Sequence, residues 1–243
     1  MIPLYASIDM ENFRRSAGFI LKIFSGIKPN IFAVHTAIAA LALYVLTTLI
    51  LILHYFEKTP APELPFCVFF ILSLSFESVR LILPLEHFYN ISSFYLLLTS
   101  KILLFSRNFG LFSLFAASVY AAGLETKKQR NFIFINAITA LIIALGTPVD
   151  TFTWKANLEP VNGYASIFYM LNIGLFLITI AGFLIAAYTR KSREYIFISL
   201  GTLLALTGRN ILLSADAWIG LAGIVLLFSG TGFICIYLHK VYL

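Results

Sequence analysis

Seven long apolar runs constrain this chain more than any other feature of its sequence. They cover residues 31–56, 65–86, 92–122, 131–148, 163–189, 194–214 and 217–239. A helix needs about 20 apolar residues to cross a bilayer, and each run is close to or above that length. All but one of the connections are short, and short connections make neighbouring helices antiparallel. We therefore predict an all-α, polytopic transmembrane helical bundle of seven spans that occupies residues 31–243 as one domain.

The composition also indicates a membrane protein. Hydrophobic residues make up 60% of the 243 residues and charged residues only 12%, whereas a soluble domain carries about 25% charged residues. Such an excess of apolar surface is stable only against hydrocarbon. The net charge of +6 does not indicate nucleic-acid binding, because the basic residues occur in short loops and form no single basic face. We predict a multi-pass protein of the plasma or inner cell membrane, with lipids as partners.

Residues 1–30 are predicted to form a separate N-terminal segment. Within it, residues 11–27 have the pattern of an amphipathic helix, with apolar and basic side chains on opposite faces. The apolar positions are Phe13, Ala17, Ile20, Leu21, Phe24 and Ile27, and the basic ones are Arg14, Arg15 and Lys22. Such a helix lies in the headgroup layer with its basic face toward lipid phosphates. The alternative is an ordered tail packed on the bundle.

The basic loops predict the orientation of the bundle. With seven spans and a cytoplasmic C-terminus, the strongly basic loops 127–130 and 190–193 both lie in the cytoplasm, as positive loops usually do. The basic residues of the N-terminal segment oppose this arrangement. Splitting the run 92–122 at residues 106–108 would give eight spans with both termini inside, but each half would have only about 15–17 residues, which is short for a bilayer. The C-terminus is cytoplasmic in both versions.

Five charged residues lie away from the ends of the predicted spans, and a charge costs at least ~2.5–3.5 kcal/mol at the bilayer centre. They are Glu77, Arg80, Lys101, Arg107 and Arg209. Glu77 and Arg80 are three residues apart, so they share a helix face and can pair. One interpretation is that this pair simply neutralises itself and holds its span against a neighbour. Counting residues from the middle of each span, however, places Glu77 and Arg107 close to the midplane. We expect the other three, Arg80, Lys101 and Arg209, to share the outer half of the bundle.

Four cations against one carboxylate do not remain buried without an anion, water or many carbonyl partners. We therefore predict that these side chains converge on an outward-facing, partly hydrated cavity that binds an anionic group. Arg107 and Arg209 are the expected direct contacts, because a guanidinium group binds carboxylate or phosphate through two hydrogen bonds. Asn108 and Asn210 come next in sequence. They can serve the cavity, although hydrogen bonding between helices is the commoner role for asparagine in a bundle.

The sequence contains no pattern of an intramembrane enzyme. There is no His-Glu-x-x-His, no Gly-x-Ser-x-Gly and no pair of membrane aspartates, and Glu77 is the only acid away from the ends of a predicted span, too few for a divalent metal site. We expect neither catalytic residues nor a metal or other cofactor. A retinal protein is also disfavoured, because the only lysine of the last apolar stretch, Lys240, lies at its end.

Two functions fit these features best, and a structural subunit of a larger complex is a third option. The preferred one is a receptor-like sensor that binds an anionic small molecule or lipid headgroup and moves its third and sixth spans. Its signal would pass to a cytoplasmic partner, to a second copy of the chain, or to a C-terminal segment beyond residue 243. The alternative is a small organic-anion transporter with Glu77 as the proton-coupling residue. The transporter is less favoured because matching halves, which many transporters have, are not evident in the sequence.

Overall fold

The computed structural model describes residues 30–56, 61–82, 93–124 and 129–242. Its helices are α3 (Ile31–Tyr55), α4 (Leu64–Ser75), the 3-10 helix η1 (Phe76–Ile82), α6 (Ser93–Ala121), α7 (Gln129–Gly146), α8 (Ala165–Thr189), α9 (Glu194–Ser214) and α10 (Ile219–Tyr242). With η1 continuing α4, seven helices in this described part are long and apolar enough to cross a membrane. The prediction of an all-helical, multi-pass membrane protein is thereby confirmed. The amphipathic helix predicted for residues 11–27 lies outside the described residues.

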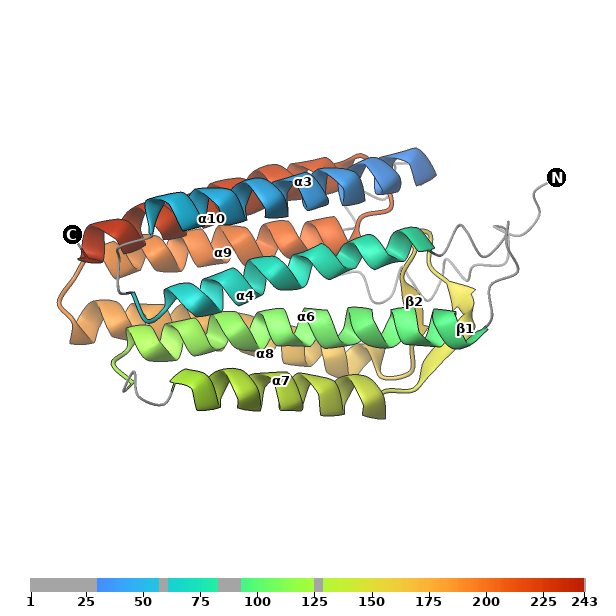
Figure 1. Cartoon of the computed structure of the whole chain (residues 1–243), viewed down its shortest axis with the longest axis horizontal. Helices are drawn as coiled ribbons and strands as arrows, with labels where there is room; N and C mark the ends of the chain where they lie inside the picture. Colours follow the sequence, from blue (N-terminus) through green and yellow to red (C-terminus); the bar gives the residue numbers. More distant parts are fainter. Residues whose placement is uncertain (1–29, 57–60, 83–92, 125–128, 243) are drawn as a thin grey trace.

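The helices run alternately up and down and lie side by side in one bundle (Figure 1). Contacts between neighbours close a ring, from α3 through α4, α6, α8, α9 and α10 back to α3. Helix α7 lies outside this ring and packs mainly on α6. Because α6 contacts α4, α7 and α8, it is the most extensively buried helix of the bundle.

The outer surface of the bundle is apolar. Helices α7 and α8 are the least buried of the seven, and the side chains that they expose include Ile142, Met170 and Leu177. A helix that is apolar on its exposed side as well as its packed side belongs in hydrocarbon. These faces are therefore suited to contact with lipid tails.

Helices α9 and α10 are joined through glycines. A Cβ atom added at Gly208 would lie 2.6 Å from the carbonyl oxygen of Gly223, and one added at Gly223 would lie 2.7 Å from the carbonyl oxygen of Gly208. Small residues allow two backbones to approach this closely in a membrane, where van der Waals packing is a main source of helix association. The two helices form the most closely packed pair in the ring.

Helix α6 continues without a break through residues 106–108, where an eight-span chain would have to turn. Its 29 residues extend about 43 Å at 1.5 Å per residue, more than the ~30 Å of the hydrocarbon core. A long span is accommodated by tilting or by projecting into the headgroup layer. The length of the apolar run at 92–122 thus reflects one long helix and not two short ones.

The polar stretch between α7 and α8 folds as a β-hairpin, which the sequence did not predict. Strand β1 (Val149–Trp154) pairs antiparallel with β2 (Pro160–Asn162), with an irregularity in the register before Trp154. At the turn, Lys155 N–H donates to the carbonyl of Glu159 over 2.9 Å. Leu158 adopts a left-handed backbone conformation, with φ of 59°. The hairpin lies across the end of the bundle where α6 begins (Figure 1).

Candidate functional site

Three arginines and two glutamates meet near the hairpin end of the bundle. They are Arg80 and Glu77 from η1, Arg107 from α6, Arg209 from α9 and Glu159 from the hairpin, and we call them the ionic cluster. Glu77, Arg80 and Arg209 are each at most 2% exposed. Charges so completely removed from solvent must be held by other charges or by hydrogen bonds.

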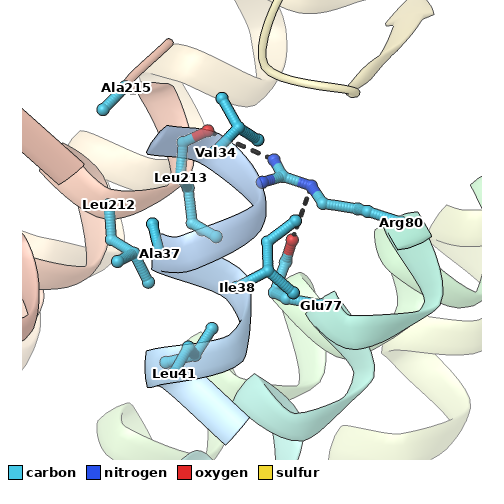
Figure 2. Close-up of a pocket in the computed structure, with 9 residues that line it drawn as sticks. All are labelled: Val34, Ala37, Ile38, Leu41, Glu77, Arg80, Leu212, Leu213 and Ala215. Atoms are coloured by element: carbon cyan, nitrogen blue, oxygen red, sulfur yellow. Dashed lines mark hydrogen bonds and ion pairs between the residues drawn. The ribbon is translucent and has the colours of Figure 1, made fainter. Parts of the chain in front are cut away.

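The 3-10 helix η1 sets the geometry of Glu77 and Arg80. Three residues per turn place side chains i and i+3 directly above one another, and Arg80 Nε lies 3.0 Å from Glu77 Oε2. Arg80 Nη2 also donates to the carbonyl of Leu213 over 3.2 Å, so this arginine bridges η1 and the end of α9 (Figure 2). A 3-10 segment of seven residues is long for this conformation, and such segments often mark hinges.

Arg107 connects both carboxylates of the cluster. Its Nε and Nη2 atoms donate to Glu77 over 2.7 and 3.1 Å, the two-pronged arrangement that makes guanidinium–carboxylate pairs strong. The remaining nitrogen, Nη1, donates to Glu159 Oε1. Arg107 lies midway along α6, so the hairpin carboxylate reaches a residue well inside the bundle.

Glu159 is held by several cationic neighbours. Its second oxygen accepts from Lys155 Nζ over 3.0 Å, and nearby Asn157 donates to the carbonyl of Leu213 over 2.8 Å. Burial alone would raise the pKa of the Glu159 carboxyl, but the charges of Arg107, Lys155 and Arg80 outweigh burial and hold this pKa well below its usual range. Glu159 therefore remains ionised at neutral pH.

Arg209 is the cation of the cluster that has no carboxylate within ion-pair distance among the described residues. Its Nη2 donates to the backbone carbonyl of Arg107 over 3.1 Å, and its Nη1 lies 3.4 Å from Asn210 Oδ1. Its Nε is buried and has no hydrogen-bond partner in the described part of the chain. With Lys155 included, four cations surround two carboxylates. The cluster therefore carries an excess of positive charge.

Lys101 does not join the ionic cluster, which corrects the expectation that four cations converge. Its Nζ donates to the carbonyls of Ala144 and Leu145 over 3.0 Å each, and to that of Thr147. These carbonyls belong to the end of α7, where the last turn leaves carbonyl groups without intrahelical partners. Lys101 thus caps α7 and fixes it to α6.

The two asparagines differ in their contacts. Asn108 is buried and donates to the carbonyl of Leu104 over 2.8 Å, within its own helix. Asn210 Oδ1 lies 3.4 Å from Asn172 Nδ2 on α8, so its contact is between helices, and it also adjoins Arg209. Among these side-chain contacts, only those of Asn210 include a member of the ionic cluster, Arg209.

The pocket beside the cluster is too small for the predicted cavity. It is lined by Val34, Ala37, Ile38, Leu41, Glu77, Arg80, Leu212, Leu213 and Ala215 and has a volume of about 10 Å³ (Figure 2), which is close to the limit for a single water molecule. Most of its lining is apolar. The Glu159 carboxylate, which comes from outside the spans, lies on Arg107, where an external anion was expected.

A second polar cluster, at the opposite end of the bundle, was not predicted. It consists of Glu63, Arg190, Tyr195 and Tyr242, and we call it the distal cluster. Glu63, which is 1% exposed, accepts from Tyr242 over 2.8 Å and from Tyr195 over 3.2 Å, and Arg190 lies 3.5 Å from it. Arg190 also donates to the carbonyl of Tyr120 over 3.0 Å. This cluster joins the ends of α4, α6, α8, α9 and α10.

Glu63 and Glu159 were missed because both lie outside the apolar runs. The local signals were weak. Glu63 stands between Pro62 and the first residues of a span, and Glu159 follows Lys155 by four residues. Neither spacing indicates that the carboxylate turns inward, since an acid in a polar loop is usually solvated.

Comparison with known proteins assigns the chain to no family. No family model matches the sequence. The chain is similar to an uncharacterized protein of Treponema pallidum (strain Nichols), with 30% identity over 100 residues that cover 41% of this chain and 29% of that protein. The matched part therefore spans less than a third of the length of that relative.

Proposed function

We propose that this protein is a receptor-like membrane sensor. It binds an anionic group at the ionic cluster and transmits the resulting helix movement to its cytoplasmic side. The observation that carries this proposal is Arg209, a cation that is 2% exposed and whose Nε has no partner among the described residues. An unpaired buried charge costs several kcal/mol even after relaxation. An incoming anion would remove this cost, so the free energy of binding favours anions over neutral molecules.

The elements around the cluster suit a sensor. Arg209 contacts the backbone of Arg107, and its helix α9 packs closely on α10 through glycines. An anion that draws Arg209 and Arg107 together would therefore move α9 and α10 as a pair relative to α6. The 3-10 helix η1, which carries Glu77 and Arg80, offers a hinge for such a movement.

The hairpin end of the bundle is proposed to face outward and the C-terminus to face the cytoplasm of a cell membrane. The basic side chains Arg190, Lys191 and Arg193 form the turn between α8 and α9, and Lys240 lies in the last turn of α10. The α8–α9 turn and the last turn of α10 both lie at the end opposite the hairpin (Figure 1). Positively charged loops are retained in the cytoplasm during insertion.

The contacts of Glu77 favour a sensor over a proton-coupled transporter. A coupling carboxylate must exchange a proton during each cycle. Glu77 is paired with two guanidinium groups, those of Arg80 and Arg107, and nearby positive charges stabilise the ionised form of a carboxyl group. Proton uptake by Glu77 would have to break both pairs.

Anion binding by the purified chain in lipid nanodiscs tests the proposal. Acetate, succinate and phosphate are titrated at constant ionic strength while the thermal unfolding midpoint is recorded. We expect at least one of them to stabilise the protein saturably, and Arg209→Gln to abolish the effect. Lys101→Gln is the matched control, since it removes a cation that caps α7 outside the cluster. Equal responses in the two variants would contradict the assignment of Arg209.

Flux measurements distinguish the two functions. The chain is reconstituted in proteoliposomes, and uptake of the labelled anion is followed with and without a proton gradient. A sensor binds the anion without sustained uptake. Uptake that exceeds that of protein-free vesicles and continues over many turnovers would replace the sensor with a transporter.

A further inference from the structure

The Glu159 carboxylate is an internal anion delivered to the ionic cluster by a loop outside the spans. It pairs with Arg107 and with Lys155, and its side chain is 15% exposed. It is the only carboxylate of the cluster that does not come from a transmembrane helix. The position it occupies is therefore filled by an element that lies outside the spans.

The packing around the cluster makes withdrawal of Glu159 necessary for any external anion. The adjacent pocket has a volume of about 10 Å³, and Arg80 and Arg209 are almost completely buried. Among the cluster's arginines, Arg107 is the most exposed, with a side chain 15% exposed, and its Nη1 is paired with Glu159. An anion that reaches Arg107 from this side meets Glu159 first.

The described hydrogen bonds of the hairpin turn are mostly local to it. Asn157 is anchored to the carbonyl of Leu213, and the turn closes on itself through the backbone pair of Lys155 and Glu159. Next to Glu159, Leu158 has a φ of 59°, a region that side chains other than glycine, asparagine and aspartate rarely adopt. The ion pairs of Glu159 with Arg107 and Lys155 add to these bonds in keeping the turn in this conformation.

We propose that Glu159 is a tethered competitor that occupies the subsite for the ligand's carboxylate, and that a ligand carboxylate binds Arg107 by displacing it and releasing the hairpin. This inference rests on the proposed function and adds to it the ligand class, a carboxylate, and the element that responds, the hairpin. The ligand class follows from Glu159, the group that now occupies the subsite. Arg107 already binds planar carboxylate groups on two of its edges, the geometry for which a guanidinium fork is best suited.

Chemical rescue tests the competition. Glu159→Ala removes a –CH₂–COO⁻ fragment, which corresponds to acetate. The full chain in nanodiscs is titrated with sodium acetate against sodium chloride at equal ionic strength. We expect Glu159→Ala to lose thermal stability in chloride and to regain it saturably with acetate, with an affinity at least tenfold higher than that of the unmodified chain. Glu194→Ala, which removes a carboxylate at the opposite end of the bundle, should respond to acetate no more strongly than the unmodified chain.

A second variant keeps the test decisive if Glu159→Ala does not fold. Glu159→Gln preserves the size of the side chain and removes the charge, and we expect it too to bind acetate at least tenfold more tightly than the unmodified chain. Equal acetate affinity in the variant and the unmodified chain would overturn the competition and leave the proposed anion site standing. Absence of carboxylate and phosphate binding in all three proteins would overturn the proposed function itself.

Discussion

At the scale of single residues, the buried charges of this protein differ in how well they are compensated. Glu77 contacts two arginines and Glu159 contacts an arginine and a lysine, whereas Arg209 relies on a backbone carbonyl and an asparagine. Since removing one partner of a buried pair leaves the other charge uncompensated, Glu77 should be the residue whose loss is least tolerated.

Glu77→Gln should destabilise the protein by about 3–5 kcal/mol, the usual cost of breaking a buried pair. Both Arg80 and Arg107 would lose a charge partner, and among the described ion pairs only Arg107 would keep another carboxylate. Reversible unfolding in denaturant and mixed micelles measures the change in the free energy of unfolding. Glu194→Gln serves as control. A loss below about 1 kcal/mol, the level of exposed ion pairs, would show that water or other groups compensate the arginines.

Acidification should remove the contribution of Glu159. Its pKa is lowered by folding because Arg107, Lys155 and Arg80 outweigh the effect of burial, so its stabilisation is present above the unfolded-state pKa of about 4.3 and is lost as pH falls toward the lower folded-state pKa. The difference in unfolding midpoint between the unmodified chain and Glu159→Gln should be constant from pH 7 to about pH 5 and shrink below it. A difference that grows on acidification would show the opposite linkage.

At the scale of elements, the arrangement depends on how individual helices and the hairpin meet. Lys101 fastens α7 to α6, the glycines of α9 and α10 bring two backbones into contact, and the hairpin carries a charge into the bundle. Apolar contacts with neighbouring helices and with lipid are similar in free energy in a membrane. Close backbone packing and polar contacts therefore decide which helices pair.

Gly223→Val should separate α9 from α10. The added side chain would meet the backbone of Gly208 and Leu212 at 2.7–3.2 Å, so the helices must move apart or fail to pack, with a loss of about 1–3 kcal/mol or more, as in other overpacked sites. Gly232→Val is a matched control on the same helix, because a Cβ there meets no atom within 4 Å. Thermal unfolding of both variants measures the contrast. Similar midpoints would show that the glycine contact is not limiting.

At the scale of the whole molecule, a ring of six helices joins two polar clusters at opposite ends. The ionic cluster links η1, α6, α9 and the hairpin, and the distal cluster links the ends of α4, α6, α8, α9 and α10. Helices α6 and α9 take part in both. Either helix is therefore a candidate to transmit a movement from one end to the other, as the proposed sensor requires.

Glu63→Gln should alter anion binding at the far end of the bundle. If α6 and α9 couple the clusters, this change should shift the acetate affinity of Glu159→Gln by about fivefold or more, the lower range of allosteric coupling. Lys191→Gln, at the exposed turn beside Arg190, is the control. Acetate affinity unaffected by Glu63→Gln would mean that the two clusters act independently.

The proposed orientation is tested by labelling from one side. Cysteine is introduced at exposed positions near each end, Val161→Cys in the hairpin and Lys191→Cys in the α8–α9 turn, in a chain whose Cys67 and Cys235 are replaced by alanine. An impermeant maleimide added to intact cells should label the first and reach the second only after permeabilisation. Labelling of Lys191→Cys in intact cells would invert the orientation.

The multi-span architecture follows from the sequence because apolar run length responds to a fixed physical dimension, the thickness of the hydrocarbon core. The described helices lie within about three residues of most predicted runs; the exception is the second, predicted to residue 86, for which the structure describes helix only to Ile82. Charged residues inside a span are as readily recognised from the sequence, since the free-energy cost of burying a charge in hydrocarbon depends on its position within its own span. That is why the sequence alone identifies Glu77, Arg80, Arg107 and Arg209 as charges within the spans.

What surrounds those charges was decided by tertiary structure. Whether Lys101 turns toward Arg107 or toward the end of α7 depends on the rotation of one helix against another, and no spacing along the chain records that angle. The inward turn of Glu159 depends on the fold of a polar loop. The sequence of this loop is equally compatible with a Glu159 side chain exposed to solvent. Membrane insertion thus selects the spans one segment at a time, whereas the partners of a buried charge are selected by the packing of all segments together.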